Sequence, residues 1–143
     1  SEETNEWVVS QADVIAASDG IPFSQGRAHP RGAGTFARIL GYYVRERGVL
    51  SLMDALRKMT LLPAQRLERI VPQMVQKGRV RVGADADLTI FNPATVVDRA
   101  TYDAPDRYSE GIRHVLVAGT LVVRDGMLVP DVTPGQPIRS GSP

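Results

Sequence analysis

The sequence contains no cysteine, and only two of its 143 residues, His29 and His114, are histidines. The lack of cysteine excludes disulfide bonds and cysteine-based zinc sites within the chain, and it leaves the redox compartment open. Two histidines alone do not complete a zinc site, because protein zinc ions draw several side-chain ligands together. His114 has mainly apolar neighbours in the sequence, and we interpret it as a surface or interface residue.

The chain also lacks any long apolar run. No stretch approaches the roughly 20 residues that a membrane-spanning helix needs. Hydrophobic residues make up 43% of the sequence and charged residues 23%, which is typical of soluble globular proteins. The chain opens at Ser1 without methionine and without a charged-then-apolar leader, so we expect a processed or artificial boundary there and a cytoplasmic location.

Acidic residues are scarce in the middle of the chain and basic residues are scarce in the rest, although the net charge is only +1. Residues 27–81 hold 12 basic and 3 acidic side chains, and the rest of the chain holds 5 basic and 13 acidic ones. A nucleic-acid face would cluster its basic residues along a groove. Here most of the arginines lie opposite the apolar stripes of short helices, as solvated helix faces do. We therefore expect neither a nucleic-acid nor a membrane partner.

A polar, glycine-rich stretch at residues 18–34 separates two apolar patterns. The continuous apolar run at residues 14–17 predicts a buried parallel strand, and the spacing of apolar residues between Phe36 and Val44 predicts an amphipathic helix. Asp19 falls at the carboxyl end of the predicted strand, where α/β proteins place catalytic and ligand-binding residues. The alternative is that Asp19 and Gly20 only make a turn, which residue type alone favours.

Three further helices are predicted. Residues 1–10 have the pattern of a frayed helix end. Ser51 and Asp54 form a capping box ahead of an apolar stripe, which predicts a short helix. Residues 62–63, Leu-Pro, predict the start of another helix, and residues 71–72, Val-Pro, predict its end, because the residue before proline avoids helical angles.

From Gly78 onward the pattern changes to short β runs between turn signals. These runs predict strands at residues 79–82, 87–91, 114–118 and 121–124, with turns at Ala118-Gly119 and Asp125-Gly126. Between the second and third strands, residues 98–111 are irregular, and we expect Tyr102 and Tyr108 to anchor this long loop.

Several of these motifs resemble the N-acyl-D-amino-acid deacylase (D-aminoacylase) branch of the amidohydrolases. The most specific group is Ser18-Asp19-Gly20, His29-Pro30-Arg31 and Gly34-Thr35-Phe36. A second specific group lies in the two predicted helices, at Leu52, Asp54-Ala55, Arg57-Lys58-Met59-Thr60 and residues 62–67. Matches shared with many amidohydrolases follow at Lys77-Gly78-Arg79, Gly83, Ala86-Asp87-Leu88, Gly111-Ile112, Val115, Val117 and Gly119. The similarity runs from about Asp13 to about Gly126.

The resemblance implies an α+β fragment. Residues 1–77 would be the end of a barrel domain, with the last β-α unit of a (β/α)8 amidohydrolase barrel and short helices. Residues 78–129 would supply carboxyl-terminal strands of a small β-sandwich, and residues 130–143, which hold four prolines, would be a loose tail. A complete barrel needs roughly 250 residues. Edges left uncovered in such a fragment recruit further chains, so we expect a homo-oligomer, or pairing with a missing amino-terminal portion.

The resemblance also implies roles for residues of the glycine-rich stretch. Asp19 would be the catalytic acid-base group near a metal centre, Arg31 would hold the substrate carboxylate, and Gly20, His29 and Gly34 would shape the loop. The parent enzyme would use zinc to hydrolyse the amide of small N-acyl-D-amino acids. We expect no metal in the isolated chain, because the other ligands belong to earlier barrel strands, so this chain alone should be inactive. Two alternatives stay open: an amidohydrolase acting on a cyclic amide, like a dihydroorotase or hydantoinase, and a noncatalytic assembly module.

Overall fold

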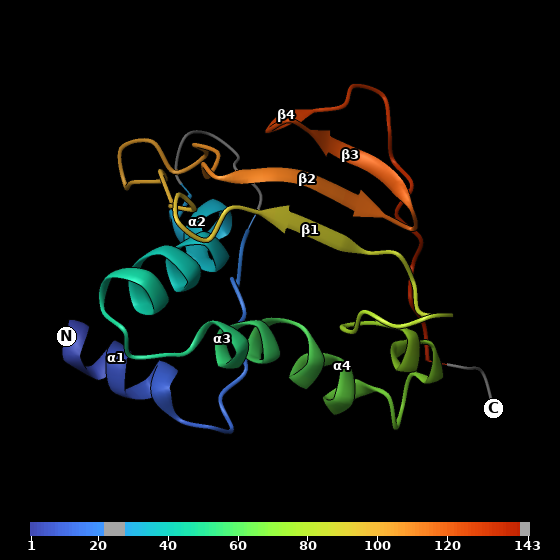
Figure 1. The fold of residues 1–143 in the computed structure, drawn as a ribbon, viewed down its shortest axis with the longest axis horizontal. Coiled ribbons are helices and arrows are strands. Elements are labelled where there is room, and N and C mark those ends of the chain that lie inside the picture. The colour runs from blue at the N-terminus through green and yellow to red at the C-terminus, as the bar shows by residue number, and fades with distance from the viewer. Residues whose placement is uncertain (22–27, 141–143) are drawn as a thin grey trace. The chain divides into compact units, whose positions relative to one another are not determined.

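The computed structural model describes residues 1–21 and 28–140, which divide into two compact units (Figure 1). The first unit contains Ser1–Ala55 and Asn92–Gly111, and the second contains Leu56–Phe91 and Ile112–Pro143. The chain therefore passes from the first unit to the second, returns, and leaves again.

Helices dominate the first unit. Helix α1 (Glu2–Ser10) begins at Ser1, whose Oγ accepts the N–H of Thr4 at 3.3 Å. Helix α2 (Arg31–Arg38) continues directly into the π-helix η1 (Ile39–Glu46), which confirms the predicted amphipathic helix. The buried face of this helix carries Ala37, Ile39, Leu40 and Tyr43. Burial of this stripe is the main source of helix stability, since helices this short are marginal alone.

The segment 92–111 packs against this helix. Its ends are joined by a two-residue bridge in which Val97 and Glu110 exchange backbone hydrogen bonds of 3.1 and 3.0 Å. Val96 is completely buried, and its carbonyl accepts a hydrogen bond of 2.5 Å from Nη1 of Arg45. A Cβ on Gly41 would lie 2.6 Å from the same carbonyl, so only glycine allows the helix and the segment to approach this closely.

Helix α3 (Leu52–Met59) crosses the boundary between the units, and the second unit adds α4 (Leu61–Leu67) and the 3₁₀ helix η2 (Pro72–Gln76). The capping box is confirmed in part: Ser51 Oγ accepts the N–H of Asp54 at 3.1 Å and donates to its carboxylate at 2.7 Å. Helix α4 has Thr60 as its N-cap and begins at Leu61, one residue before the predicted start. It ends at Leu67, before the predicted end at Val71. Pro72 opens η2, where its missing N–H costs no hydrogen bond.

The second unit also contains an antiparallel sheet in the order β1-β2-β3-β4. Its strands are β1 (Leu88–Phe91), β2 (Ile112–Val117), β3 (Thr120–Arg124) and β4 (Met127–Leu128). Both predicted turns are confirmed, and each has positive φ at both central residues: 49° and 78° at Ala118-Gly119, and 51° and 79° at Asp125-Gly126. This geometry matches the twist of the flanking strands. The protein is thus a small α+β structure with an antiparallel sheet.

Two predicted strands are wrong for this chain. Residues 14–17 and 79–82 are irregular, and the side chains of Val80 and Val82 are exposed. An isolated strand leaves its N–H and C=O groups without ladder partners, so an apolar run forms a strand only when a neighbour is present. Within residues 1–21 and 28–140, no strand pairs with either segment. The missed strand β4 has two residues, too few for an alternating pattern to appear.

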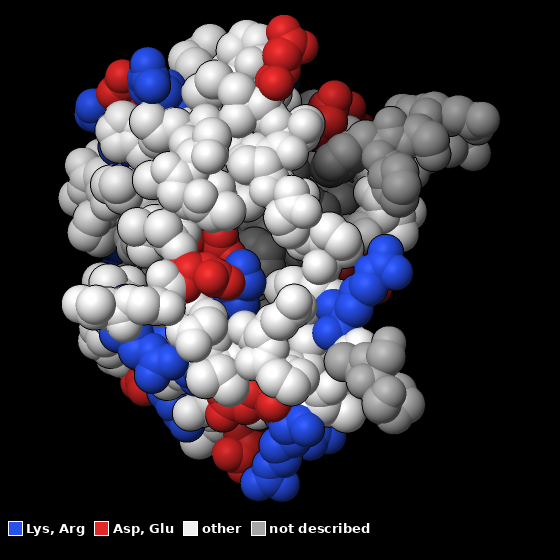
Figure 2. Space-filling view, turned by 90° about the vertical axis from the view of Figure 1, so that its right-hand side faces the viewer, with Lys and Arg blue, Asp and Glu red and all other residues white. Residues whose placement is uncertain are grey.

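Ion pairs explain the uneven distribution of charge along the chain. Arg38 and Arg47, from the basic stretch, face Glu2 and Glu6 of α1 at 3.6 and 2.5 Å. In the second unit, Lys77 of the same stretch pairs with Asp85 and Asp87. Figure 2 shows one face of the molecule, on which basic and acidic side chains are interspersed. Segregation in the sequence therefore becomes pairing in the fold.

The Lys77 cluster also ties the sheet to the segment before it. Asp87 accepts the N–H of Ala118 at 2.8 Å through Oδ1, and its Oδ2 lies 2.5 Å from Nζ of Lys77. The backbone hydrogen bond from Ala118, followed by the one from Lys77, lowers the pKa of Asp87. Hydrogen bonds to Asp85 and Asp87 raise the pKa of Lys77. One carboxylate thus holds both a lysine and the turn between β2 and β3.

We expect Asp87→Asn to lower the thermal midpoint of the chain by about 1 to 4 °C at pH 7, because a partly exposed ion pair contributes only about 0.2 to 1 kcal/mol. A carboxylate whose pKa is lowered by folding stabilises the fold when the pH is above its ordinary pKa. This contribution is lost as the pH falls through the lowered pKa. The difference between the variant and the wild type should therefore vanish in strongly acid solution. Circular dichroism melts over a pH series, with exposed Asp103→Asn as the control, measure it. A difference independent of pH would contradict this role.

Candidate active site

Asp19 and Arg31, separated by twelve positions in the sequence, form a two-pronged contact. Nη2 of Arg31 lies 2.6 Å from Oδ2 of Asp19, and Nε of Arg31 donates to the Asp19 carbonyl oxygen at 3.0 Å. The side chains stay open to solvent, with exposed fractions of 81% for Asp19 and 41% for Arg31. The structure therefore brings together the predicted catalytic and substrate-binding residues on an accessible surface.

The backbone at Asp19 has an uncommon conformation. Its φ is +46°, in the left-handed region that aspartate tolerates better than most residues, and the N–H of Gly20 donates to Ser18 Oγ at 3.3 Å. A Cβ on Gly20 would lie 3.2 Å from Cα of Gly32, so the backbone at Gly20 lies directly against the start of α2. Residues 18–21 form neither a hydrogen-bonded turn nor a bend, so the turn that residue type favoured is absent. The Asp19 carboxylate lies beside Arg31 without it.

His29 lies immediately before α2 and bridges two partners. Its Nδ1 accepts the backbone N–H of Arg31 at 3.0 Å, and its Nε2 lies 3.0 Å from the hydroxyl of Tyr102. The two rings meet edge to face, with centroids 5.0 Å apart. The N-cap residue Pro30 has no side-chain hydrogen bond to the helix, so His29 supplies an acceptor at this helix end.

Gly34 is buried where α2 meets the segment 92–111. A Cβ at this position would lie 3.2 Å from Cβ of Asp98 and 3.6 Å from Cβ of Ala100. Nearby, Ser109 Oγ donates to the carbonyl of Ala33 at 3.2 Å. These contacts hold the segment against the first turns of the helix that carries Arg31.

A polar network that sequence reasoning missed lies on the next turns of the helix. The hydroxyl of buried Tyr43 donates to Glu2 at 2.8 Å, and Arg38 lies 4.4 Å from the ring centroid of Tyr42 while approaching Asp98 at 3.8 Å. Burial, followed by the hydrogen bond with Glu2, raises the pKa of Tyr43. The residues of this network are too far apart in the sequence to form a motif, so no local pattern predicts the network.

Within the described ranges, 1–21 and 28–140, no group of three or more histidine, cysteine, aspartate and glutamate side chains is placed to hold a metal ion. Asp19 offers one carboxylate, and its nearest cation is the Arg31 guanidinium. A single carboxylate does not make a zinc site. None of the described helices is long and apolar enough to cross a membrane.

An aspartate beside an arginine at the start of a helix, in a chain that also forms an antiparallel sheet, does not by itself identify a class of protein. Comparison with known families identifies the class of protein. The sequence profile described as "Amidohydrolase family" matches residues 2–123, which is most of the chain. The chain therefore belongs to the amidohydrolase family.

The relatives lie in the branch that the sequence motifs indicated, which confirms that resemblance. The N-acyl-D-glutamate deacylase of Alcaligenes xylosoxydans xylosoxydans is 45% identical over 125 residues, covering 87% of this chain and 24% of the relative. A D-aminoacylase structure solved to study its binuclear metal centre superposes with a TM-score of 0.83 at 36% identity, covering 92% of this chain and 26% of that one. The N-acyl-D-glutamate deacylase of Bordetella bronchiseptica, complexed with zinc and a phosphonate inhibitor, gives 0.79 at 38% identity, covering 90% and 27%. This chain spans about a quarter of the length of each.

The Tyr43 network leads to a test of stability. We expect Tyr43→Phe to lower the thermal midpoint by about 2 to 4 °C, because the Glu2 carboxylate loses a hydrogen bond of about 1 kcal/mol. Tyr42→Phe, on the adjacent position of the same helix, should change it by less than 1 °C on the same scale. Calorimetric scans of the three proteins make the comparison. Equal effects of the two substitutions would show that the Glu2 contact contributes nothing.

Proposed function

We propose that the longer protein represented by this chain hydrolyses the amide bond of N-acyl-D-amino acids, with Asp19 as its acid-base group and Arg31 as its anchor for the substrate carboxylate. The observation that carries the proposal is the direct Asp19–Arg31 contact, 2.6 Å between Nη2 and Oδ2, in a chain that matches deacylases over most of its length. An acid-base group must lie within reach of the bound substrate, and the contact of Asp19 with the guanidinium that would bind the substrate carboxylate supports this role.

Within that longer protein, we propose that residues 14–17 form the last strand of a (β/α)8 barrel, for which neighbouring strands would supply the missing ladder. Residues 1–77 would then close the barrel domain and residues 78–129 would join a small β domain. Asp19 would stand at the carboxyl end of the last strand, on the face where such barrels assemble their sites.

The proposed cofactor of the longer protein is zinc, the metal present in the complex of the B. bronchiseptica relative. When bound, it would lower the pKa of a water so that hydroxide forms near neutral pH. Asp19 would take a proton from the attacking water as its oxygen bonds to the amide carbon, and would give that proton to the nitrogen as the C–N bond breaks. This double use of one carboxylate requires a position open to water and substrate, and the Asp19 side chain is 81% exposed.

Arg31 would exchange one carboxylate for another when substrate binds. In this structure its guanidinium contacts the Asp19 carboxylate through Nη2 and the Asp19 carbonyl oxygen through Nε. An exposed ion pair of this kind contributes only about 0 to 1 kcal/mol, so a substrate carboxylate replaces it at little cost. The planar guanidinium suits a two-pronged carboxylate contact better than a lysine does. Departure of Arg31 would leave the Asp19 carboxylate free for proton transfer.

We expect Asp19→Asn to abolish turnover of N-acyl-D-amino acids by the longer enzyme while leaving its folding intact, because the amide keeps the shape but does not accept the proton. Steady-state kinetics with circular dichroism as a folding control measure both properties. Turnover within about tenfold of the wild type, a barrier change of only about 1.4 kcal/mol, would overturn the role. Preferred turnover of a cyclic amide by the wild type would instead favour a dihydroorotase-like or hydantoinase-like enzyme.

Arg31→Lys should raise KM for substrates that carry a free carboxylate, since the charge remains but the fork geometry is lost. We expect an increase of about tenfold, the equivalent of about 1.4 kcal/mol in binding. The matched measurement uses the same substrates with the carboxylate converted to a carboxamide, for which the variant and the wild type should differ little. An equal loss with both substrate series would indicate a folding role for Arg31.

We also propose that this chain, studied without the rest of the longer protein, assembles as a homodimer or larger oligomer. Exposed apolar side chains such as Val80, Val82 and Ile70 support the proposal, because uncovered apolar surface and unpaired segments recruit further chains. Sedimentation at micromolar concentration should show species heavier than a monomer, with loss of structure on dilution. A compact monomer that melts cooperatively would refute it.

A further inference from the structure

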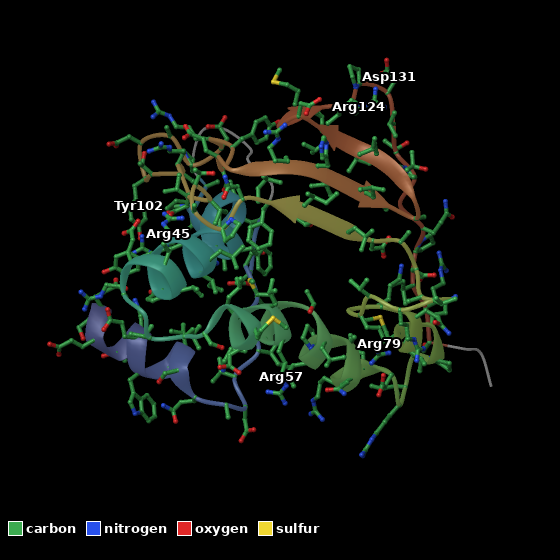
Figure 3. All side chains as sticks on the ribbon, in the orientation of Figure 1. Arg45, Arg57, Arg79, Tyr102, Arg124 and Asp131 are labelled. Atoms are coloured by element: carbon green, nitrogen blue, oxygen red, sulfur yellow. The ribbon has the colours of Figure 1, made fainter. Side chains whose placement is uncertain are left out.

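Tyr102 lies on the loop that follows β1 in the chain, and Figure 3 labels it. Its side chain is 74% exposed, so burial does not hold the ring in place. The polar contact is more specific: the hydroxyl lies 3.0 Å from Nε2 of His29, across 73 positions of sequence. An exposed aromatic ring that makes a directed hydrogen bond beside a candidate active site is a candidate for a functional role.

The loop itself is well ordered by its own hydrogen bonds. Thr101 and Ala104 exchange backbone hydrogen bonds of 3.1 and 3.2 Å around Tyr102, and Thr101 Oγ1 accepts a further one from Ala104. At the base of the loop, Arg99 pairs with Glu110 at 2.6 Å. The hydroxyl of Tyr102 is therefore presented at a defined position rather than on a free tether.

The direction of the hydrogen bonds at His29 follows from its other partner. A backbone N–H only donates, so Nδ1 of His29, which accepts from Arg31, carries no proton. The neutral imidazole then carries its proton on Nε2 and donates it to the Tyr102 oxygen. Tyr102 thus favours the one tautomer in which Nδ1 accepts from the backbone of Arg31.

We propose that Tyr102 is a positioning residue for Arg31 and acts through His29. The N–H of the first residue of a helix has no partner within the helix, and here His29 supplies it. A fixed backbone at Arg31 directs its guanidinium to the position that it now shares with Asp19. The inference rests on the proposed function, because it assigns Arg31 the substrate carboxylate as its ligand.

The test uses the longer enzyme with Tyr102→Phe, and with Tyr108→Phe as the matched control. Tyr108 lies on the same loop and is 78% exposed. Loss of one hydrogen bond should raise KM for N-acyl-D-amino acids about fivefold with little change in kcat. Carboxamide substrates should show no such change, and Tyr108→Phe should match the wild type within about twofold for both series.

His29→Asn separates the two contacts of the imidazole. The asparagine Oδ1 occupies a place similar to Nδ1 and still accepts from Arg31, but the shorter side chain does not reach Tyr102. His29→Asn should therefore reproduce the effect of Tyr102→Phe. The double variant should be no worse than either single one, because both remove the same interaction.

Three results would overturn the inference: wild-type KM in Tyr102→Phe, equal losses with carboxamide substrates, or additive losses in the double variant. Failure of the proposed function looks different. If Asp19→Asn keeps near-wild-type turnover, the assignment of the site itself is wrong. If Asp19→Asn is inactive while Tyr102→Phe keeps the wild-type KM, only the positioning role of Tyr102 fails.

Discussion

Every backbone N–H and C=O group needs a hydrogen-bond partner, and this constraint explains which segments of the chain form strands and how helix α2 begins. Strands β1 to β4 meet it by pairing in sequence order across short turns. The apolar residues 14–17 and 79–82 remain irregular because the described residues provide no ladder beside them. At the start of α2 the same requirement is met by an imidazole, since His29 accepts the N–H of Arg31.

The candidate site combines a closely packed backbone with a solvent-exposed pair of charges. The backbone packs closely at Gly20 and Gly34, where a Cβ would lie 3.2 Å from a neighbouring carbon. The Asp19–Arg31 pair is exposed and therefore contributes little to stability. The proposed role of Arg31 requires both properties, because close packing sets the direction of the side chain and weak pairing permits exchange of one carboxylate for another.

Long-range polar contacts connect the parts of the first unit. Tyr43 reaches Glu2 across 41 positions, and Tyr102 reaches His29 across 73. Both contacts end on residues of, or next to, the helix that carries Arg31 or its π-helical continuation. The orientation of this helix therefore depends on two distant segments of the chain, one before it and one after it.

The sequence by itself determined the family, the α-helices and the hairpin turns, but not the 3₁₀ helix η2. Capping at Ser51 and the turns at Ala118-Gly119 and Asp125-Gly126 depend on neighbouring residues, so local pattern predicts them. Asp19 and Arg31 were predicted from their motifs as site residues, and the structure brings their side chains into contact. Tertiary structure alone decided which apolar runs became strands and that Tyr102 contacts His29, because a ladder or a hydrogen bond between distant segments depends on how the chain folds back, and local sequence does not encode this.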